Sequence, residues 1–280
     1  MKGANQVVKG FIILSLYLFL VTVLTVAVSH VDRNEVFVKG GAFGDKTVAS
    51  FLIDRHLVTV GDFDEFVAST GYLTEAENFG SAGVFDFEEQ RFIAVEGANY
   101  RYPFGKNGPK ASSNHPVTQV TWNDAVAYAK WKGKRLPTKT EWEYAASSGT
   151  LSDATYAWGE GVTKDGKYRA NFWQGSFPFH NSAEDGYLTT SPVGAFGSNK
   201  IGLSDMGGNV WQWCNDTVEP SGVEKIIDPR KRKLLKGGSY LCDPLVCHGF
   251  RIFGESNTTP ETAMAHIGFR CVKDVDSGMN

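Results

Sequence analysis

The strongest periodic pattern in the chain lies between residues 117 and 148, and it is short. Apolar residues recur at helical spacing from Trp122 to Ala129, and Gly133 ends the run. A second helix is predicted to begin at Thr138, which opens a Thr-x-x-Glu capping box. Few other stretches sustain such a pattern, so long regular helices should be scarce.

The rest of the chain is divided into short pieces by glycine and aromatic residues. The 31 glycines, 10 prolines and 13% aromatic content favour a loop-rich domain stabilised by aromatic clusters. Residues 36–60 are predicted to form short strands, and a helix is predicted from Val60 to the glycine at position 71. Residues 72–116 have no sustained periodicity and are predicted to form a long structured loop. No repeat or linker appears, which indicates one domain over residues 31–280.

Charge excludes one class of partner. The chain has 28 basic and 31 acidic residues and a formal net charge of -3, so nothing indicates nucleic-acid binding. The basic run at residues 230–233 is short enough to be a solvated turn.

The N-terminus has the pattern of an export signal. Lys2 and Lys9 precede an apolar run over residues 11–28, and Ala27-Val28-Ser29 has the small residues of a cleavage site. Residues 1–30 are therefore predicted to be a signal peptide or an N-terminal membrane anchor. Both alternatives place the domain outside the cytoplasm, in the periplasm, the secretory lumen or the medium. Membrane contact is expected only through this segment.

Two of the four cysteines, Cys242 and Cys247, follow a Gly-Gly pair and have four residues between them. Outside the cytoplasm, a structural disulfide is one interpretation of such a pair. A redox or nucleophilic pair is the second, because two nearby thiols can exchange with an external thiol. A metal site is the third, and copper suits it better than zinc because only His248 stands adjacent as a further ligand. Cys214 and Cys271 complete the set of four, and the pairing stays open.

Oxygen-bearing side chains lie among glycines at Asn171, at Asp185 and over residues 205–212. Calcium takes six to eight oxygen ligands from carboxylates, amides and carbonyls, and such loops supply all three. Asn, Asp and Gly also form ordinary turns, which is the simpler interpretation when no EF-hand spacing is present.

Nine short blocks of the sequence occur in the order and spacing of one known family. They are Gly71–Glu77, Gly97–Tyr100, His115–Val117, Trp122–Tyr128, Gly133–Thr138, Glu141–Tyr144, Gly208–Trp211, Gly237–Tyr240 and Gly268–Cys271. The chain resembles the formylglycine-generating enzymes, or sulfatase-modifying factors, over almost everything after residue 36. This resemblance implies a single α+β domain with a C-type-lectin-like core and much irregular structure.

The resemblance also implies an oxidase reaction. In this family, O2 oxidises the cysteine of a Cys-x-Pro-x-Arg segment, in an unfolded or nascent sulfatase, to Cα-formylglycine. Cu(I) would be held between Cys242 and Cys247, with Ser239 beside the site and Trp211 lining it. We expect the protein to be a monomer.

Calcium is implied in the same way, at two sites. The first matches Asn171, the carbonyl of Phe172, Asp185 and the carbonyl of Tyr187. The second matches Asp205, Gly208, Val210 and Gln212. Gln212 stands where the family usually has glutamate, which removes a charge and predicts a weaker second site.

The chain departs from the family's pattern mainly around the two cysteines. The departures are Asp243, Pro244, Val246, Gly249, Glu255 and His266. The alternative hypothesis is therefore an exported superfamily member of changed role, either another oxidoreductase or a lectin-like binding module, without formylglycine activity. A permanent disulfide between the two cysteines would favour it.

Overall fold

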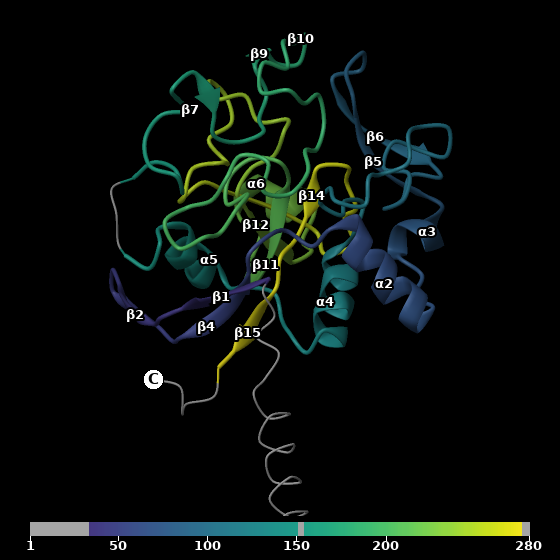
Figure 1. Ribbon diagram of the computed structural model, residues 1–280. Coiled ribbons are helices and arrows are strands. Elements are labelled where there is room, and N and C mark those ends of the chain that lie inside the picture. The colour runs from purple at the N-terminus through teal and green to yellow at the C-terminus, as the bar shows by residue number, and fades with distance from the viewer. Residues whose placement is uncertain (1–33, 151–153, 276–280) are drawn as a thin grey trace, which may run out of the picture. The chain divides into compact units, whose positions relative to one another are not determined.

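Threonine capping boxes begin four of the five described helices. A computed structural model describes residues 34–150 and 154–275 (Figure 1). At Thr59, Thr74, Thr121 and Thr138 the hydroxyl accepts the N–H three residues on, while the acidic side chain at that position accepts the threonine N–H. The helices are α2 (Val60–Thr70), α3 (Glu75–Phe79), α4 (Trp122–Trp131), α5 (Lys139–Ala146) and α6 (Gly222–Ile227). The longest has 11 residues, so the predicted scarcity of long helices is confirmed.

The described strands are also short. They are β1 (Glu35–Val38), β2 (Gly41–Phe43), β3 (Lys46–Val48), β4 (Phe51–Asp54), β5 (Ser81–Asp86), β6 (Arg91–Glu96), β7 (Thr163–Lys164), β8 (Lys167–Tyr168), β9 (Gly175–Ser176), β10 (His180–Asn181), β11 (Trp211–Val218), β12 (Arg232–Lys236), β13 (Glu255–Thr258), β14 (Ile267–Gly268) and β15 (Val272–Asp274). Much of the remaining described chain is irregular, which confirms the predicted α+β class with extensive irregular structure.

Two small sheets organise the domain. One has the strand order β1-β4-β15, and the other has the order β13-β12-β11-β14. In the second sheet β11 and β12 are antiparallel, whereas β11 and β14 are parallel. Figure 1 shows β11 and β12 at the centre of the domain, between α5 and α4. The second sheet therefore supports the chain that leads from β12 into the cysteine segment.

Residues 72–116 differ from the prediction of a long structured loop, because part of them is regular secondary structure. They contain α3 and the hairpin β5–β6, whose six residue pairs run from Ser81 and Glu96 to Asp86 and Arg91. Both faces of the hairpin are largely half-buried or exposed. Because neither face is fully buried, the hairpin does not require the alternation of apolar and polar residues by which strands are predicted.

A buried ion pair supports the end of β12. The Lys236 side chain is fully buried, and its Nζ lies 2.7 Å from the Glu143 carboxylate on α5. Gly237 and Gly238 follow with φ values of 91° and 65°. A Cβ on Gly238 would lie 2.6 Å from the backbone nitrogen of Phe250, so this turn needs glycine for its conformation and for its close packing.

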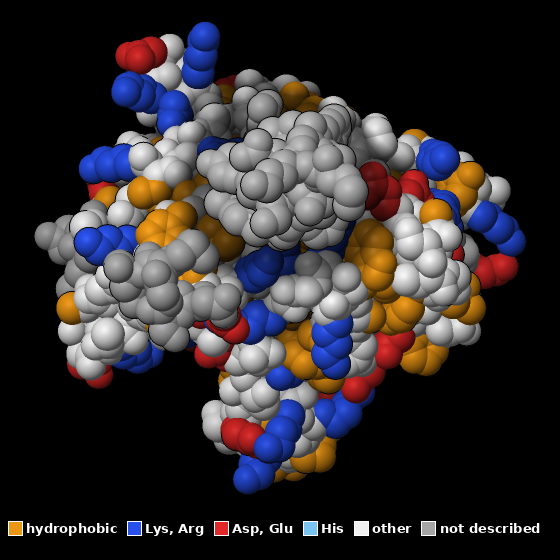
Figure 2. Space-filling view, turned by 60° about the horizontal axis from the view of Figure 1, so that its bottom comes forward, with side chains coloured by type: hydrophobic (Ala, Val, Ile, Leu, Met, Phe, Trp, Pro, Cys, Tyr) orange, Lys and Arg blue, Asp and Glu red, His pale blue; other side chains and the backbone are white. Residues whose placement is uncertain are grey.

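The surface carries charges of both signs. On the face shown in Figure 2, Lys and Arg side chains are interspersed with Asp and Glu, and hydrophobic side chains reach the surface between them. This distribution agrees with the small net charge of -3.

The chain divides after Glu35, and the part from Val36 onward forms one compact unit. The predicted signal peptide or membrane anchor at residues 1–30 lies outside the described residues and stays a prediction. Within residues 34–150 and 154–275, no helix has the length and apolar character needed to cross a bilayer.

Candidate active site

The turn after β12 places Ser239 beside the first cysteine. Ser239 is fully buried, and its backbone oxygen accepts a hydrogen bond from the N–H of Cys242 at 2.9 Å. Its hydroxyl oxygen accepts the N–H of Leu241 at 3.3 Å, and its own N–H lies 3.5 Å from the Cys242 sulfur. Ser239 thus holds the backbone that presents Cys242, and its hydroxyl lies within the same turn.

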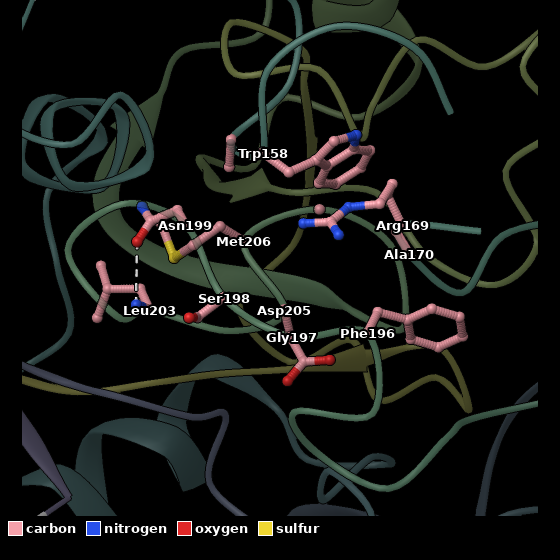
Figure 3. Close-up of a pocket in the computed structure, with 12 residues that line it drawn as sticks. Trp158, Arg169, Ala170, Phe196, Gly197, Ser198, Asn199, Leu203, Asp205 and Met206 are labelled. Atoms are coloured by element: carbon pink, nitrogen blue, oxygen red, sulfur yellow. Dashed lines mark hydrogen bonds between the residues drawn. The ribbon is translucent and has the colours of Figure 1, made fainter. Parts of the chain in front are cut away.

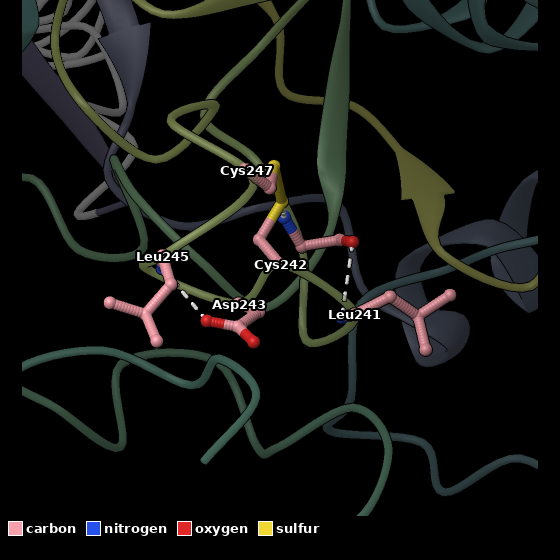
Figure 4. Close-up of a disulfide and its surroundings, with 6 residues drawn as sticks. Leu241, Cys242, Asp243, Leu245 and Cys247 are labelled. Carbon is pink, nitrogen blue, oxygen red and sulfur yellow. Dashed lines mark hydrogen bonds between the residues drawn. A yellow bond between two sulfur atoms is a disulfide. The ribbon is translucent and has the colours of Figure 1, made fainter. Parts of the chain in front are cut away.

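Cys242 and Cys247 are joined by a disulfide, with their Cα atoms 5.1 Å apart (Figure 4). Cys242 is 3% exposed, while Cys247 is half-buried and is the cysteine that solvent reaches. The sequence left three interpretations open for this pair, and all three need the sulfur atoms to be close. The structure supplies this proximity in the oxidised form, and reduction of the bond would leave two adjacent thiols.

The other two cysteines do not pair with each other. Cys214 and Cys271 are both free and buried, so the pairing that the sequence left open does not include a bond between these two. Burial raises the pKa of both thiols well above the ordinary value, which keeps them protonated and unreactive. Sulfur chemistry in the described part of the chain therefore centres on Cys242 and Cys247.

Asp243 organises the loop between the cysteines. Its side chain is almost fully buried, and one carboxylate oxygen accepts the N–H of Leu245 at 2.8 Å. The other oxygen lies 3.5 Å from the N–H of Phe177, which comes from a distant part of the chain. The Asp243 carbonyl also accepts the N–H of Cys247 at 2.7 Å. One residue that departs from the family's pattern therefore sets the position of the second cysteine.

Trp211 lies at the start of β11 and packs against Gly249. A Cβ at position 249 would lie 2.5 Å from Cζ2 of the Trp211 ring, which is closer than real contacts allow. Trp211 is only 8% exposed as a result of this and other packing. The glycine at this position therefore makes room for the indole ring close to the cysteine loop.

His266 lies next to Trp211, and one nitrogen of its buried ring has no hydrogen-bond partner among the described residues. Its carbonyl accepts the Trp211 N–H at 2.9 Å, and its ring stacks on Phe92 of β6 at a centroid distance of 4.9 Å. Within the described residues its Nδ1 has no hydrogen-bond partner, although the residue is only 8% exposed. Burial lowers the pKa of His266 to about 4, so the ring is neutral at physiological pH.

The carboxylate of Glu255, a further departure from the family's pattern, forms an ion pair with a nearby lysine. On β13 it pairs with Lys236 in the strand register, and its carboxylate contacts the ammonium of Lys139. Its charge is therefore balanced at the edge of the second sheet.

The first predicted calcium site contains an oxygen that lacks a partner. Among the described residues, Asn171 Oδ1 is buried without a hydrogen bond, whereas its Nδ2 donates to the Thr189 carbonyl at 2.8 Å. Asp185 lies nearby, and its carboxylate accepts the N–H groups of Phe172 and Tyr187 at 3.1 and 2.9 Å. Burial raises the pKa of this carboxyl. An unpartnered amide oxygen beside a half-buried carboxylate offers oxygen ligands to a hard cation such as calcium, whereas the Phe172 carbonyl already accepts the side-chain amide of Gln174.

The second predicted calcium site fits less well. Gln212 Oε1 already accepts hydrogen bonds from Trp142 Nε1 at 2.9 Å and from Arg270 Nε at 2.8 Å, and its Nε2 donates to the Asp205 carbonyl at 2.8 Å. The Arg270 guanidinium also donates to that carbonyl at 3.1 Å. Gln212 Oε1 therefore has no lone pair left for a metal. Gly208 and Val210, which belong to the same predicted site, would have to bind a cation without Gln212 as a ligand.

The Asp205 carboxylate in this segment is also engaged. It accepts the N–H of Gly194 at 2.7 Å, the hydroxyl of Ser204 at 2.9 Å and the Asn209 side chain at 3.3 Å. Figure 3 shows Asp205 among the residues of a small pocket of about 20 Å³, also lined by Trp158 and Arg169, which has room for about one water molecule. Protein donors thus replace what a second cation would supply.

Metal binding elsewhere has little support. Across residues 34–150 and 154–275, no three His, Cys, Asp or Glu side chains gather in a way that could hold a metal ion. A metal in this domain would depend on the two thiolates or on amide and carbonyl oxygens.

The fold and the site define an α+β domain that carries a close pair of cysteines on a glycine turn, supported by a buried ion pair. A family model described as the sulfatase-modifying factor enzyme 1-like domain matches residues 25–275. The chain therefore belongs to the sulfatase-modifying factor family.

Relatives of known name are similar over most of their length. The chain is 42% identical over 276 residues to the formylglycine-generating enzyme of Thermomonospora curvata, which covers 87% of this chain and 89% of that protein. It is 40% identical over 274 residues to the enzyme of the same name from Streptomyces coelicolor, with 86% and 87% covered. It is also 39% identical over 249 residues to the inactive C-alpha-formylglycine-generating enzyme 2 of Mus musculus, with 82% and 77% covered.

Solved structures agree on the fold. The crystal structure of CarF matches with a TM-score of 0.58 and 26% identity, and the match covers 87% of this chain and 98% of that one.

Proposed function

We propose that this protein oxidises the cysteine of a Cys-x-Pro-x-Arg segment in an unfolded sulfatase chain to Cα-formylglycine. The observation that carries the proposal is the pair Cys242 and Cys247, which lie side by side after a glycine turn, with Cys242 buried and Cys247 half-buried. Relatives named formylglycine-generating enzyme, at about 40% identity, support the same reaction.

The reduced pair is suited to Cu(I), because two thiolates select a soft monovalent ion. Copper would supply the one-electron chemistry that lets a closed-shell thiol react with O2. In the balanced reaction, the methylene thiol of the substrate cysteine, O2, two electrons and two protons give the aldehyde, hydrogen sulfide and water. An external thiol would supply the two electrons, and it would also keep Cys242 and Cys247 reduced.

The chain's own residues position this chemistry. Ser239 fixes the turn that presents Cys242, Asp243 fixes the approach to Cys247, and Trp211 forms an apolar wall close to the cysteine loop. Calcium at Asn171 and Asp185 would brace the loop that includes Trp173, whose backbone N–H donates to the Cys242 carbonyl at 3.1 Å. The domain would act outside the cytoplasm as a monomer, secreted or held by its N-terminal segment.

Turnover of a synthetic peptide tests the proposal. Protein treated with reductant and loaded with copper should convert a Cys-x-Pro-x-Arg peptide to its aldehyde in air, detected by mass spectrometry and by hydrazide capture. Cys242→Ser and Cys247→Ser should abolish turnover, and Cys214→Ala, which removes a buried thiol elsewhere, should retain it. Absence of aldehyde from folded, reduced, copper-loaded protein would refute the proposal.

The alternative of a changed role is favoured by the disulfide and by the similarity to an inactive mouse relative. Such a protein would keep the bond between Cys242 and Cys247 in a thiol buffer that reduces ordinary surface disulfides, and it would not bind Cu(I). Thiol titration and copper binding measured before and after reduction separate the two functions.

A further inference from the structure

One face of the sheet β1-β4-β15 leaves a large aromatic ring exposed. In β1 the side chains of Val36 and Val38 are buried, whereas Phe37 between them is 47% exposed. Because side chains alternate across a strand, Phe37 lies on the opposite face of the sheet from the two valines. An open groove of about 600 Å³ runs beside Phe37, between β1 and the ends of the hairpin β2–β3.

The neighbouring strands show the same alternation. Phe51 and Ile53 of β4 and Val272 of β15 are buried in one core cluster with side chains of α5. Between them, Leu52 is half-buried and Lys273 is exposed, and these two residues are directly opposite each other in the strand register. Figure 1 shows this sheet at the lower margin of the compact unit, with α5 above it. We call the surface that points away from α5 the outer sheet face, and it consists of Phe37, Leu52 and Lys273.

Basic side chains exceed free acidic ones around the outer sheet face. Lys39, directly after β1, and Lys273 are exposed, and neither has an ion-pair partner within residues 34–150 and 154–275. The carboxylates of Asp54 and Asp274 are each paired with a basic side chain, at 2.6 and 2.5 Å. The exposed carboxylate of Asp45, at the turn between β2 and β3, balances only one of the two lysines.

The end of α4 adds an aromatic and basic edge to this side of the sheet. Arg135, four residues beyond α4, exchanges backbone hydrogen bonds with Val272 of β15 at 2.9 and 2.8 Å. At the end of α4, Trp131 is 36% exposed, and the ammonium of Lys132 lies 4.6 Å from its ring centroid. Lys130 beside it is exposed as well. Tryptophan and lysine together are typical of side chains at a membrane–water interface.

The length of chain before β1 limits which side of the domain can meet a membrane. Residues 11–28 are an apolar run of 18 residues, and a helix of that length extends about 27 Å, close to the hydrocarbon thickness of a bilayer. Only residues 29–34 separate this run from β1, and six residues span about 20 Å at most. The compact unit that begins at Val36 has a radius of gyration of about 18 Å for its length. The side of the unit that carries β1 is therefore the side within reach of such a membrane.

We propose that residues 11–28 are retained as a membrane anchor and that the outer sheet face docks on the surface of that bilayer. Phe37 enters the headgroup layer, where its ring leaves water, and the lysines around it contact the phosphate groups of anionic lipids. The occupant of this face is thus a phospholipid surface. The inference goes beyond the oxidase reaction and does not depend on it.

Docking in this way would leave the candidate active site facing the aqueous compartment. Trp173, two residues before β9, donates its backbone N–H to the Cys242 carbonyl at 3.1 Å, so the cysteine loop lies on the β9 side of the unit. Figure 1 shows β9 and β10 at the upper margin, opposite β1 and β4. A polypeptide substrate would therefore approach from the side away from the bilayer.

Photocrosslinking to lipid tests the docking face. Full-length protein with p-benzoylphenylalanine in place of Phe37 is reconstituted in nanodiscs that contain phosphatidylglycerol, and illumination is followed by mass spectrometry of the intact chain. The matched control carries the same side chain in place of Phe179, which is 75% exposed between β9 and β10. Position 37 should give at least about fivefold more lipid adduct than position 179, because only a side chain within contact distance of a lipid can react with it.

Charge variants test the contribution of the lysines. Added to the probe at position 37, Lys39→Glu/Lys273→Glu should lower the adduct at least about threefold with phosphatidylglycerol and have little effect with phosphatidylcholine alone, because basic residues are attracted only by an anionic surface. Lys164→Glu/Lys167→Glu, on β7 and β8, makes the same change in charge and should leave the adduct unchanged. All four lysine side chains are exposed, so both pairs of variants should fold.

The outcomes separate this proposal from the oxidase. More adduct at position 37 than at 179, lowered only by Lys39→Glu/Lys273→Glu, supports the docking face. Equal adduct at both positions, or an equal loss with both pairs of charge variants, overturns it. Recovery of a chain that lacks residues 1–30 also overturns it, because the domain is then free of the bilayer. Aldehyde formation is measured separately with the synthetic peptide, so failure of one proposal is distinguishable from failure of the other.

Discussion

Replacing Glu143 by glutamine would leave the ammonium group of Lys236 buried without a counter-ion. The Lys236 side chain is 0% exposed and that of Glu143 is 9% exposed, and the two charged groups are 2.7 Å apart. Removing one partner of such a pair costs about 3–5 kcal/mol, because the remaining charge keeps its desolvation penalty and loses its attraction. A domain is stable by only about 5–15 kcal/mol, so the substitution should remove a large share of the total. The effect should reach the cysteine loop, which begins directly after Lys236.

The buried ammonium group of Lys236 also predicts how the stability of Glu143→Gln changes with pH. Burial lowers the pKa of Lys236, and the hydrogen bond to Glu143 opposes that shift. Without Glu143 the folded-state pKa should fall further below the unfolded value of about 10.4. Between these two pKa values the unfolded chain binds more protons than the folded one, so stability increases as pH rises. Glu143→Gln should therefore regain part of its lost stability on moving from pH 7 to pH 9.5.

Urea unfolding of the purified protein, followed by tryptophan fluorescence at both pH values, measures these effects. The double variant Glu143→Leu/Lys236→Met is the control, and it should match the wild type or exceed it by about 1–4 kcal/mol, since it removes both charges. A loss below about 1 kcal/mol in Glu143→Gln, the lower end of what a lost hydrogen bond costs, would refute the reasoning. A larger loss that does not change with pH would refute the assignment of the cost to a buried ammonium.

Other predictions concern the calcium loop, Trp211 and His266. Chelation of calcium should lower the melting temperature of the wild type, and Asn171→Ala should remove that dependence; an unchanged melting temperature on chelation would argue against the first calcium site. Gly249→Ala should cost about 1–3 kcal/mol and shift the tryptophan emission, because a Cβ there overlaps the Trp211 ring; wild-type stability and emission would contradict this packing. Because His266 has a pKa of about 4 in the folded state, the unfolded chain binds more protons between pH 6.5 and 4. The wild type should lose about 3 kcal/mol over that interval in urea titrations, and His266→Asn should lose measurably less; equal slopes would contradict a buried neutral ring. Isothermal titration should find one calcium per chain, since Gln212 and Asp205 are already occupied by protein donors; two sites of similar affinity would contradict this assignment.

Features that depend on neighbours in the sequence could be predicted well. The starts of α2, α4 and α5 follow from capping at Thr59, Thr121 and Thr138, where both hydrogen bonds span only three residues. The separation of five between Cys242 and Cys247 likewise allowed their proximity to be proposed. The same reasoning missed α3, although Thr74 opens an equivalent capping box, because the helix has only five residues and no room for a periodic apolar pattern.

The sequence alone thus determined the helix starts, the family and the cysteine pair, because these depend on interactions within a few residues or on blocks kept in order. Only the tertiary structure decided how the site is surrounded. The contact of Asp243 with Phe177 spans 66 residues, that of Gln212 with Arg270 spans 58, and that of Lys236 with Glu143 spans 93. Which polar groups meet across such distances depends on how the whole chain packs, and no local pattern encodes it. The ring contacts of Phe85 with Phe177 and of Phe87 with Trp173 belong to the same category, since they join two segments that have no common period.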